Sequence, residues 1–185
     1  AAEAPLMPLK WLRTPNIILP IAIQALLNFA YMGGFIVVPQ MLEIGLGYSA
    51  SHVGWLIIAR PLAFSITAPL ASFFTMRAGE RKSGVIGACG VIASMLILSS
   101  MASGSSDLLV VLGLGLSGIG FGIAAPALTA LVSNAVDDET IGVAGAMQQL
   151  LSQMGAVLGS TVMISVHEMT VGSTTVVRSY GIALL

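Results

Sequence analysis

The sequence predicts an all-α integral membrane fold with five transmembrane helices and the start of a sixth. Hydrophobic residues make up 56% of the chain and charged residues only 8%, and the mean hydropathy is +0.97. Soluble domains carry about 25% charged residues, so this chain has too few of them to cover itself with a polar surface. Its apolar runs are also long enough to cross a bilayer core of about 30 Å, because a helix rises about 1.5 Å per residue.

A basic cluster between two apolar runs predicts the orientation of the bundle. Residues 77–82 read Arg-Ala-Gly-Glu-Arg-Lys and hold three of the seven Lys and Arg residues of the chain. Short loops rich in Lys and Arg stay in the cytoplasm. Lys10 and Arg13 fall on the same side of the predicted topology, and Arg178 falls on the other. We therefore expect a multi-pass protein of the cell (inner) membrane, with the N-terminal end of this sequence in the cytoplasm.

Two parts of the chain differ in composition. Residues 1–16 are polar and marked by prolines, which predicts a cytoplasmic linker with Trp11 at the membrane interface. Residues 17–185 form the transmembrane bundle, which we expect to be incomplete. The apolar run at its C-terminal end indicates a sixth span that continues beyond this sequence.

The first span is expected at residues 17–39 and carries a polar face. Gln24 and Asn28 are four residues apart and so share one side of a helix, with Tyr31 close to it. Polar side chains that face lipid are costly, so this side should face the bundle or a water-filled cavity. Interhelical hydrogen bonding and lining of a substrate pathway are both open for these three residues.

The second span contains Arg60, which is a candidate for the substrate pathway. It follows an outer loop at residues 40–51, in which Ser51 is a plausible N-cap. A charge inside the membrane costs several kcal/mol unless it is paired or hydrated, so it marks a functional site by default. Snorkelling to the interface is the alternative. Pro61 and Pro69 each remove a helical hydrogen bond, so this helix should bend.

The third and fourth spans are rich in small residues. We expect the third at residues 83–102, then a short outer loop, with Asp107 as the N-cap of the fourth. Glycines in a membrane helix allow close backbone approach to a neighbour. The residues of the fourth span that we expect to pack in this way are Gly113, Gly118, Gly120 and Pro126.

The fifth span is expected at residues 142–166, after an acidic loop at residues 134–141. Asp137, Asp138 and Glu139 suit a helix N-terminus and are candidates to pair with Arg77 or Arg81. The face of the span that should pack against a neighbour carries Gln148, Ser152, Gly155 and Gly159. His167, Glu168 and Arg178 should lie outside, before the sixth span.

Several other classes of function are disfavoured. The net charge of −1 gives no reason to expect nucleic acid as a partner. The single Cys89 allows no disulfide framework and should be a small residue of the bundle. Gly113, Gly115 and Gly118 mimic a dinucleotide fingerprint, but no strand precedes them. No nucleophile–base pair, phosphate loop or metal-ligand spacing is present, so we expect no catalytic residues, no metal and no enzyme activity.

The basic hairpin resembles a motif of the major facilitator superfamily. The loop between the second and third helices of each half of such a transporter reads roughly G-x-L-a-D-R-x-G-r-k. In residues 72–81 of this chain, Arg77, Gly79 and Arg81 match that motif, while Ser72 and Met76 replace its first Gly and its Asp.

Two further segments are similar to the same superfamily. The glycine-rich fourth span resembles the fourth helix of a facilitator half, and Leu114 stands where an N-terminal half has Arg, which favours a C-terminal half. The segment 126–159 and the linker Pro-Leu-x-Pro-Leu-x-x-Leu-Arg resemble drug:proton antiporters of the 14-helix type.

The resemblance implies the C-terminal half of a major facilitator fold. Such folds pair two halves, each an inverted repeat, and rock around a site at the membrane midplane. The implied function is proton-coupled secondary active transport, with multidrug or small-molecule efflux by alternating access. The implied partners are the lipid bilayer, an N-terminal half outside this sequence and a small-molecule substrate, with a proton gradient in place of a cofactor. The alternative is a membrane scaffold or assembly subunit without a transport cycle, which has no need of Arg60.

Overall fold

The computed structural model describes residues 11, 13–101, 106–171 and 175–185. The predicted linker at residues 1–16 lies mostly outside the described residues, as do Lys10 and most of the expected loop at residues 103–107. In chain order the helices are α1 (Pro15–Gln40), the π-helical turn η2 (Met41–Gly45), α2 (Ala50–Ile57), α3 (Ala59–Ala78), α4 (Glu80–Ser99), α5 (Asp107–Ser133), the 3-10 turn η3 (Asp138–Thr140), α6 (Ile141–Val171) and α7 (Val176–Ala183).

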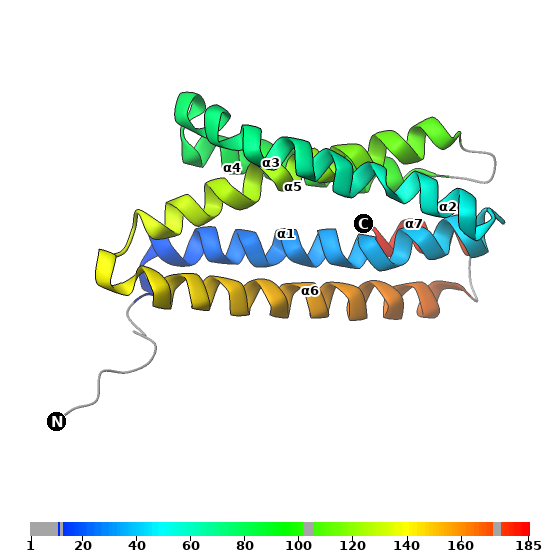
Figure 1. The fold of residues 1–185 in the computed structure, drawn as a ribbon. Helices are drawn as coiled ribbons and strands as arrows, with labels where there is room; N and C mark the ends of the chain where they lie inside the picture. The colour runs from blue at the N-terminus through cyan, green and yellow to red at the C-terminus, as the bar shows by residue number, and fades with distance from the viewer. Residues whose placement is uncertain (1–10, 12, 102–105, 172–174) are drawn as a thin grey trace.

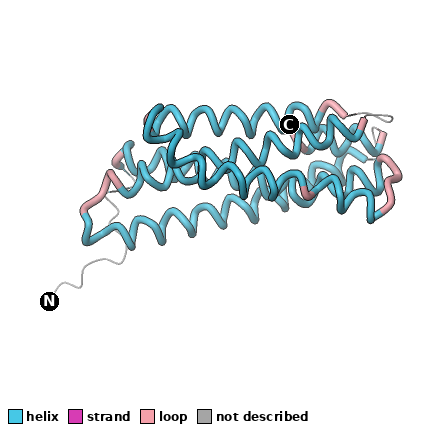
Figure 2. Tube along the Cα trace, turned by 45° about the horizontal axis from the view of Figure 1, so that its top comes forward, coloured by secondary structure: helices cyan, strands magenta, loops and turns pink. Residues whose placement is uncertain are grey.

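The helices run roughly parallel to one long axis, as the predicted membrane bundle requires (Figures 1 and 2). Within the described residues, five helical stretches are long and apolar enough to cross a membrane. They are 15–45, 50–78, 80–99, 107–133 and 138–171. The all-α fold with five spans and the start of a sixth is therefore confirmed, with α7 as that start.

The bundle is built from a group of three helices, α3, α4 and α5, and the pair α1 and α6, with one contact that joins them. The most extensive contacts join α4 to α5, α1 to α6, and α3 to α5, and α1 then packs on α5. In Figure 1, α1 accordingly lies between α6 on one side and the group of α3, α4 and α5 on the other. The short α7 packs against α6 and η2.

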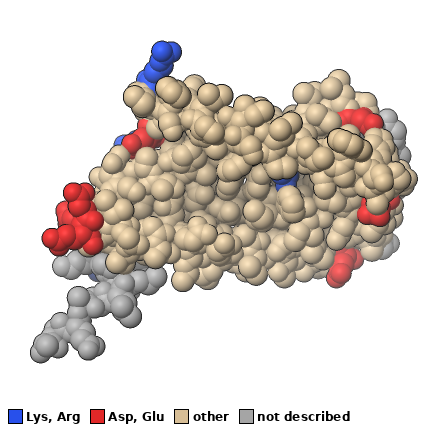
Figure 3. Space-filling view, viewed as in Figure 1, with Lys and Arg blue, Asp and Glu red and all other residues tan. Residues whose placement is uncertain are grey.

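Charged side chains lie at the two ends of the bundle, and the long flank between them is almost entirely uncharged (Figure 3). The turn between α3 and α4 and the segment that holds Asp137, Asp138 and Glu139 lie at the same end of the molecule (Figure 1). That arrangement is the one the predicted topology requires for two loops on one side of a membrane. Most flank side chains are apolar and exposed, and a bilayer would cover them.

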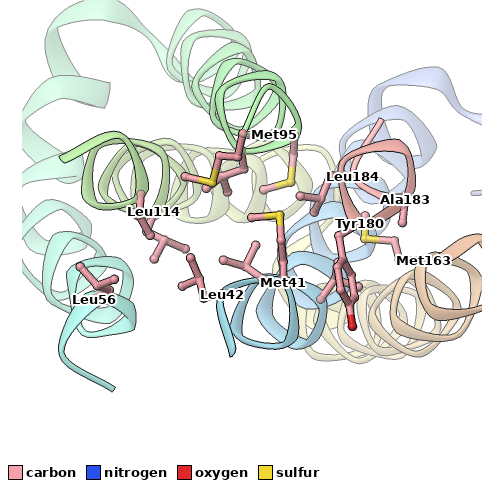
Figure 4. Packing of buried hydrophobic residues seen from close by; sticks show 14 of the residues in the cluster. Met41, Leu42, Leu56, Met95, Leu114, Met163, Tyr180, Ala183 and Leu184 are labelled. Atoms are coloured by element: carbon pink, nitrogen blue, oxygen red, sulfur yellow. The ribbon is translucent and has the colours of Figure 1, made fainter. Parts of the chain in front are cut away.

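A large apolar cluster lies at the end where α1 passes into η2. Fifteen buried apolar residues form one cluster there, contributed by α1, η2, α2, α4, α5, α6 and α7. Met41, Leu42, Met95 and Leu114 point toward one another in it (Figure 4). Among the described α-helices, all except α3 contribute to this cluster.

The loop after the first span is shorter than we expected. We expected residues 40–51 to be loop, but the chain stays helical through Gly45 and enters α2 at Ala50. The predicted N-cap Ser51 was also wrong, because Ser49 has the extended backbone of a cap and its hydroxyl accepts the N–H of His52 at 3.3 Å. Ser51 already lies inside the helix.

The second span is broken, as its prolines predict, but at only one of them. Helical structure is interrupted at Ile58, three residues before Pro61, and α3 continues unbroken through Pro69. Proline has no N–H to donate to the carbonyl four residues earlier, which for Pro61 is that of Ile57. The break places Arg60 in the first turn of α3.

The basic hairpin is tighter than a loop of six residues. Helix α3 ends at Ala78 and α4 begins at Glu80, so only Gly79 lies outside a helix. Gly79 has φ of +86°, a conformation that side chains with a Cβ rarely adopt. This turn therefore requires glycine at that position of the motif.

Three further expectations need correction. Asp107 is not an N-cap but the first residue of α5, which follows Ser106. His167 and Glu168 lie within α6, and Arg178 lies within α7, because both helices extend past the ends we predicted. Cys89 is exposed on α4 and not packed inside the bundle.

Candidate functional site

Arg60 lies at a junction of three helices and is the most deeply buried charged residue of the described chain. Only 2% of its surface is exposed. Its Nε donates a hydrogen bond to Ser117 Oγ of α5 at 2.8 Å, and its Nη1 donates to the backbone carbonyl of Tyr31 in α1 at 3.0 Å. The guanidinium therefore links α3 to both neighbouring helices, and snorkelling is not what this side chain does here.

Three aromatic rings lie in sequence beside the guanidinium group, beginning with that of Tyr31. Arg60 Cζ lies 4.8 Å from the centroid of the Tyr31 ring, within cation–π distance. The Tyr31 ring stacks on Phe121 with centroids 4.4 Å apart, and Phe64 lies 6.0 Å from Phe121. A delocalised cation over a ring face is stabilised by the ring quadrupole, so Tyr31 compensates part of the cost of burying this charge.

One nitrogen of Arg60 has no hydrogen-bond partner among the described residues. Nη2 is buried and donates to no polar atom of the described residues. It faces Gly34 of α1, where a Cβ built on the glycine would lie 3.3 Å from it. A cavity of about 40 Å³ adjoins the guanidinium and is lined by Gly34, Val38, Ile57 and Leu114.

The structure brings together only two of the four residues that we predicted to line a substrate pathway. Tyr31 and Arg60 are in direct contact, as described above. Gln24 and Asn28 precede Tyr31 in α1, and their side chains form no hydrogen bond with Tyr31 or Arg60. Asn28 Nδ2 donates to the Gln24 carbonyl at 3.0 Å. Gln24 Oε1 is buried and has no partner among the described residues. Their role in a pathway stays a prediction.

Ser117 and Phe121 belong to this site, although the sequence analysis did not single them out. Ser117 is fully buried, and its hydroxyl also donates to the Leu114 carbonyl at 2.7 Å while it accepts from Arg60. A signal was present, because Ser117 is the one hydroxyl within the glycine run 113–122. Its distance from Arg60 in the sequence hid the contact.

The predicted packing glycines lie against backbone of neighbouring helices. A Cβ on Gly118 would collide with the Arg60 carbonyl, and one on Gly120 would lie 2.7 Å from the Gly87 carbonyl of α4. Gly155 and Gly159 of α6 lie directly against the carbonyls of Ala25 and Phe29 in α1. Each position therefore brings two helices into backbone contact.

The other two residues that we predicted to pack helices together are Gly113 and Pro126. A Cβ on Gly113 would meet the Leu98 side chain at 2.7 Å. Pro126 is half-buried inside α5, which continues through it. Gln148, on the packing face of α6, donates to Thr129 Oγ1 of α5 at 3.2 Å.

The loop-motif residues lie at the surface of the basic end. Arg77 is exposed in the last turn of α3, and Arg81 Nη2 donates to Asn16 Oδ1 at the start of α1 at 3.2 Å. Glu80 Oε1 accepts from Asn134 Nδ2 at the end of α5 at 2.7 Å. The acidic residues 137–139 form no ion pair with Arg77 or Arg81, so that predicted pairing is wrong and amide side chains hold the turn instead.

A polar cluster closes the opposite end of the bundle. Asp107 at the start of α5 accepts from the Tyr48 hydroxyl at 2.9 Å and lies 2.8 Å from His52 Nε2, while the Tyr48 and His52 rings stack 4.7 Å apart. The hydrogen bond to Asp107 raises the pKa of Tyr48 above its usual value. These contacts attach the turn between η2 and α2 to α5.

A second cavity is an apolar groove whose lining does not include Arg60. It has a volume of about 1140 Å³ and is lined by α1, α4, α5, α6 and α7, with Cys89 among the lining residues. None of the predicted pathway residues line it. Within the described residues, no group of His, Cys, Asp and Glu has the arrangement of a metal site.

Comparison with known proteins places this helical bundle in a family. A model of the Major Facilitator Superfamily matches residues 4–177, nearly the whole sequence. The chain belongs to the Major Facilitator Superfamily. The superfamily assignment agrees with the all-helical bundle, the five spans and the Arg77–Gly79–Arg81 turn.

Curated relatives in the superfamily carry names of resistance and transport proteins. The chain is 30% identical over 162 residues to the multidrug resistance protein Stp of Mycobacterium tuberculosis. It is also 30% identical over 167 residues to the tetracenomycin C resistance and export protein of Streptomyces glaucescens, and 20% identical over 162 residues to the multidrug transporter protein MdtP of Bacillus subtilis. Each alignment covers 88% of this chain and 30% of the relative, so the chain spans about a third of their length.

Proposed function

We propose that this chain is the C-terminal half of a proton-coupled exporter of small molecules that works by alternating access. The observation that carries the proposal is the alignment of 88% of the chain with relatives named for multidrug resistance and antibiotic export. In the motif that α5 resembles, an N-terminal half has Arg at the position that Leu114 holds here. Leu114 therefore supports the assignment to a C-terminal half. Transport, and not catalysis, is what the names of these relatives describe.

The exposure of the helices supports a second half as partner. In the most apolar part of the span 50–78 only 17% of residues are buried, and in the span 138–171 only 22%, against 39–44% in the other three spans. These two spans therefore offer the most surface to lipid or to another helical half. We assign one side of α3 and α6 to the N-terminal half and the remaining flank to the bilayer.

The proton-coupling group is proposed to come from outside this chain. The described acidic residues lie at the ends of the spans and not in their centres, as Glu43, Glu80, Asp107 and Glu168 illustrate. Arg60 stays charged under ordinary conditions and so does not carry the proton itself. Its proposed contribution is a fixed positive charge and a fixed attachment of α3 beside the transport pathway.

A transport assay on the protein encoded by the full gene tests this proposal. Everted vesicles from an efflux-deficient bacterium that expresses the protein should accumulate a fluorescent cationic or aromatic drug when a pH gradient is imposed. Accumulation should stop when a protonophore collapses the gradient, because transport is then uncoupled from its driving force. Accumulation driven by ATP without a gradient, or none with any drug of a broad panel in correctly inserted protein, contradicts the proposal.

Cysteine labelling tests the proposed orientation, with the N-terminal end of this sequence in the cytoplasm. In a Cys89→Ser background, Ala78→Cys at the basic turn should react with an impermeant maleimide only in everted vesicles. Ser106→Cys, exposed at the start of α5, should react only in intact cells. The opposite pattern would invert the topology and remove the cytoplasmic assignment of the basic turn.

A further inference from the structure

Arg60 has donor capacity that the protein leaves unused in the described structure. A guanidinium group carries five N–H donors, spread over Nε, Nη1 and Nη2. Nε is engaged by Ser117 and Nη1 by the Tyr31 carbonyl, while Nη2 is buried and has no acceptor. A buried donor without an acceptor destabilises the fold, and more so when the group is charged. The arrangement around Nη2 therefore calls for an acceptor.

Among the described residues, the positive charge of Arg60 also has no counter-charge in contact with it. The ion pair found in the described residues joins His52 to Asp107, and no carboxylate contacts Arg60. Ser117, a carbonyl group and an aromatic ring supply dipoles and a quadrupole but no negative charge. Because a guanidinium group remains protonated, this site cannot lower its cost by becoming neutral. An anion at Nη2 would supply both the missing acceptor and the missing charge.

The cavity beside Nη2 limits the size of that anion. It holds about 40 Å³, and its walls other than Arg60 are apolar. On this measure of volume one water molecule needs about 10–15 Å³, so the cavity admits a small ion and excludes a drug molecule. Gly34 leaves Nη2 approachable, because a Cβ there would lie 3.3 Å from the nitrogen.

We propose that Arg60 Nη2 and the cavity beside Gly34 form a binding site for one small monovalent anion, represented by chloride. The anion accepts from Nη2 while Ser117 and the Tyr31 carbonyl hold the other nitrogens in place. The site is separate from drug binding, since its volume is too small for a drug. It joins α1, α3 and α5, so the anion stabilises their junction.

Chloride-dependent stability of the purified protein, produced from its full gene, tests the site. The thermal unfolding midpoint should rise and saturate as sodium chloride replaces sodium gluconate at constant ionic strength, because a ligand that binds only the folded state stabilises it. Bromide should replace chloride, and sulfate, which is larger and divalent, should not. Equal unfolding midpoints in chloride and gluconate would mean that chloride does not accept the hydrogen bond of Nη2, which overturns the proposal.

A matched pair of glycine substitutions separates this site from surface binding. Gly34→Ala places a methyl group over Nη2 and keeps both other hydrogen bonds of Arg60, so chloride binding should weaken by about tenfold or more, as expected for one lost charge-assisted contact. Gly115→Ala is the control, since a Cβ there meets nothing within 4 Å. Equal chloride titrations for Gly34→Ala and Gly115→Ala overturn the proposal.

A direct measurement decides the question if Gly34→Ala yields no folded protein. Crystals of the unsubstituted protein grown in bromide should show an anomalous scattering peak at about 3.3 Å from Nη2, a usual distance for a halide and an N–H donor. Bromide found only elsewhere on the protein overturns the proposal whatever the outcome of the substitutions.

Discussion

Two contacts between helices in this chain both depend on glycine, but only one of them also contains a hydrogen bond between side chains. Helix α6 lies on α1 through Gly155 and Gly159, which touch the carbonyls of Ala25 and Phe29. Helix α3 lies on α5 through Gly118, which touches the Arg60 carbonyl, and here a side chain of α3 also donates to Ser117. The first contact depends on shape alone, whereas the second adds a directional polar bond.

The difference shows what a buried charge contributes to a membrane bundle. Glycine sets how near two backbones come, but neighbouring registers of a smooth helix surface differ little in energy. The two hydrogen bonds of Arg60 fix one register of α3, because their partners are single atoms on α5 and α1. Close packing thus sets the distance between helices, and Arg60 sets the alignment.

Gly155→Leu should have the largest effect, because the shape-dependent contact offers no space. The added side chain must push α6 away from the Ala25 carbonyl, and overpacking of this kind costs about 1–3 kcal/mol or more. We expect most of the folded protein to be lost, as monitored by size-exclusion chromatography of a fluorescent fusion. Gly145→Leu in the same helix is the control, since a Cβ there meets nothing within 4 Å. Equal yields for both variants would mean that α6 does not rest on α1 in this way.

Gly118→Leu should be the next most damaging change, with a smaller effect because α3 is held mainly on one side. The leucine would displace α3 from α5 and pull Arg60 away from Ser117. We expect a lower unfolding midpoint and lost transport, with folded protein still recovered. Gly115→Leu, which faces open space on the same helix, should behave like the unsubstituted protein. Transport retained at normal rates by Gly118→Leu would contradict a role for this contact.

Arg60→Gln should affect transport more than insertion. The amide can replace part of the contact to Ser117 but loses the charge and the second bond, and a hydrogen bond to a charged group contributes about 1.5–3 kcal/mol. We expect normal membrane levels with transport impaired or with a shifted pH dependence. Arg60→Lys keeps the charge but not the planar fork, so it should restore transport only in part. Full activity of Arg60→Gln at every pH would leave Arg60 with no part in transport.

The smallest effect is expected at Tyr48, far from both contacts. Its hydrogen bond to Asp107 raises its pKa, so the folded state holds the phenolic proton more tightly than the unfolded state. The stabilisation is complete below the ordinary tyrosine pKa of about 10 and is lost as the pH rises through the raised value. The difference between the absorbance titrations of the unsubstituted protein and of Tyr48→Phe should show a late-titrating tyrosine, and Asp107→Asn should move its titration toward ordinary pH. Identical titrations in Asp107→Asn and the unsubstituted protein would contradict this assignment.

Much of the bundle could be predicted from the sequence, and its errors lie at helix ends. The spans were placed within a few residues, since hydropathy and the rise of a helix are local properties. Ser51 was predicted as the cap, but Ser49 takes that role, because the helix begins at Ala50 and only the backbone conformation shows where it begins. Helix α6 was predicted too short because His167 and Glu168 are polar, although polarity does not end a helix.

The sequence by itself predicted the membrane class, the five spans, a bend in the second span, the short basic hairpin at residues 77–82 and the superfamily. It also marked Arg60 as exceptional, since a charge within an apolar run is visible without any structure. Only the tertiary structure decided what Arg60 touches: Tyr31 and Ser117 lie 29 and 57 residues away along the chain. Helical periodicity assigns residues to faces of one helix but carries no information on how helices are rotated and shifted against one another. Those rotations result from the packing of the whole bundle, and they leave Nη2 facing the cavity beside Gly34.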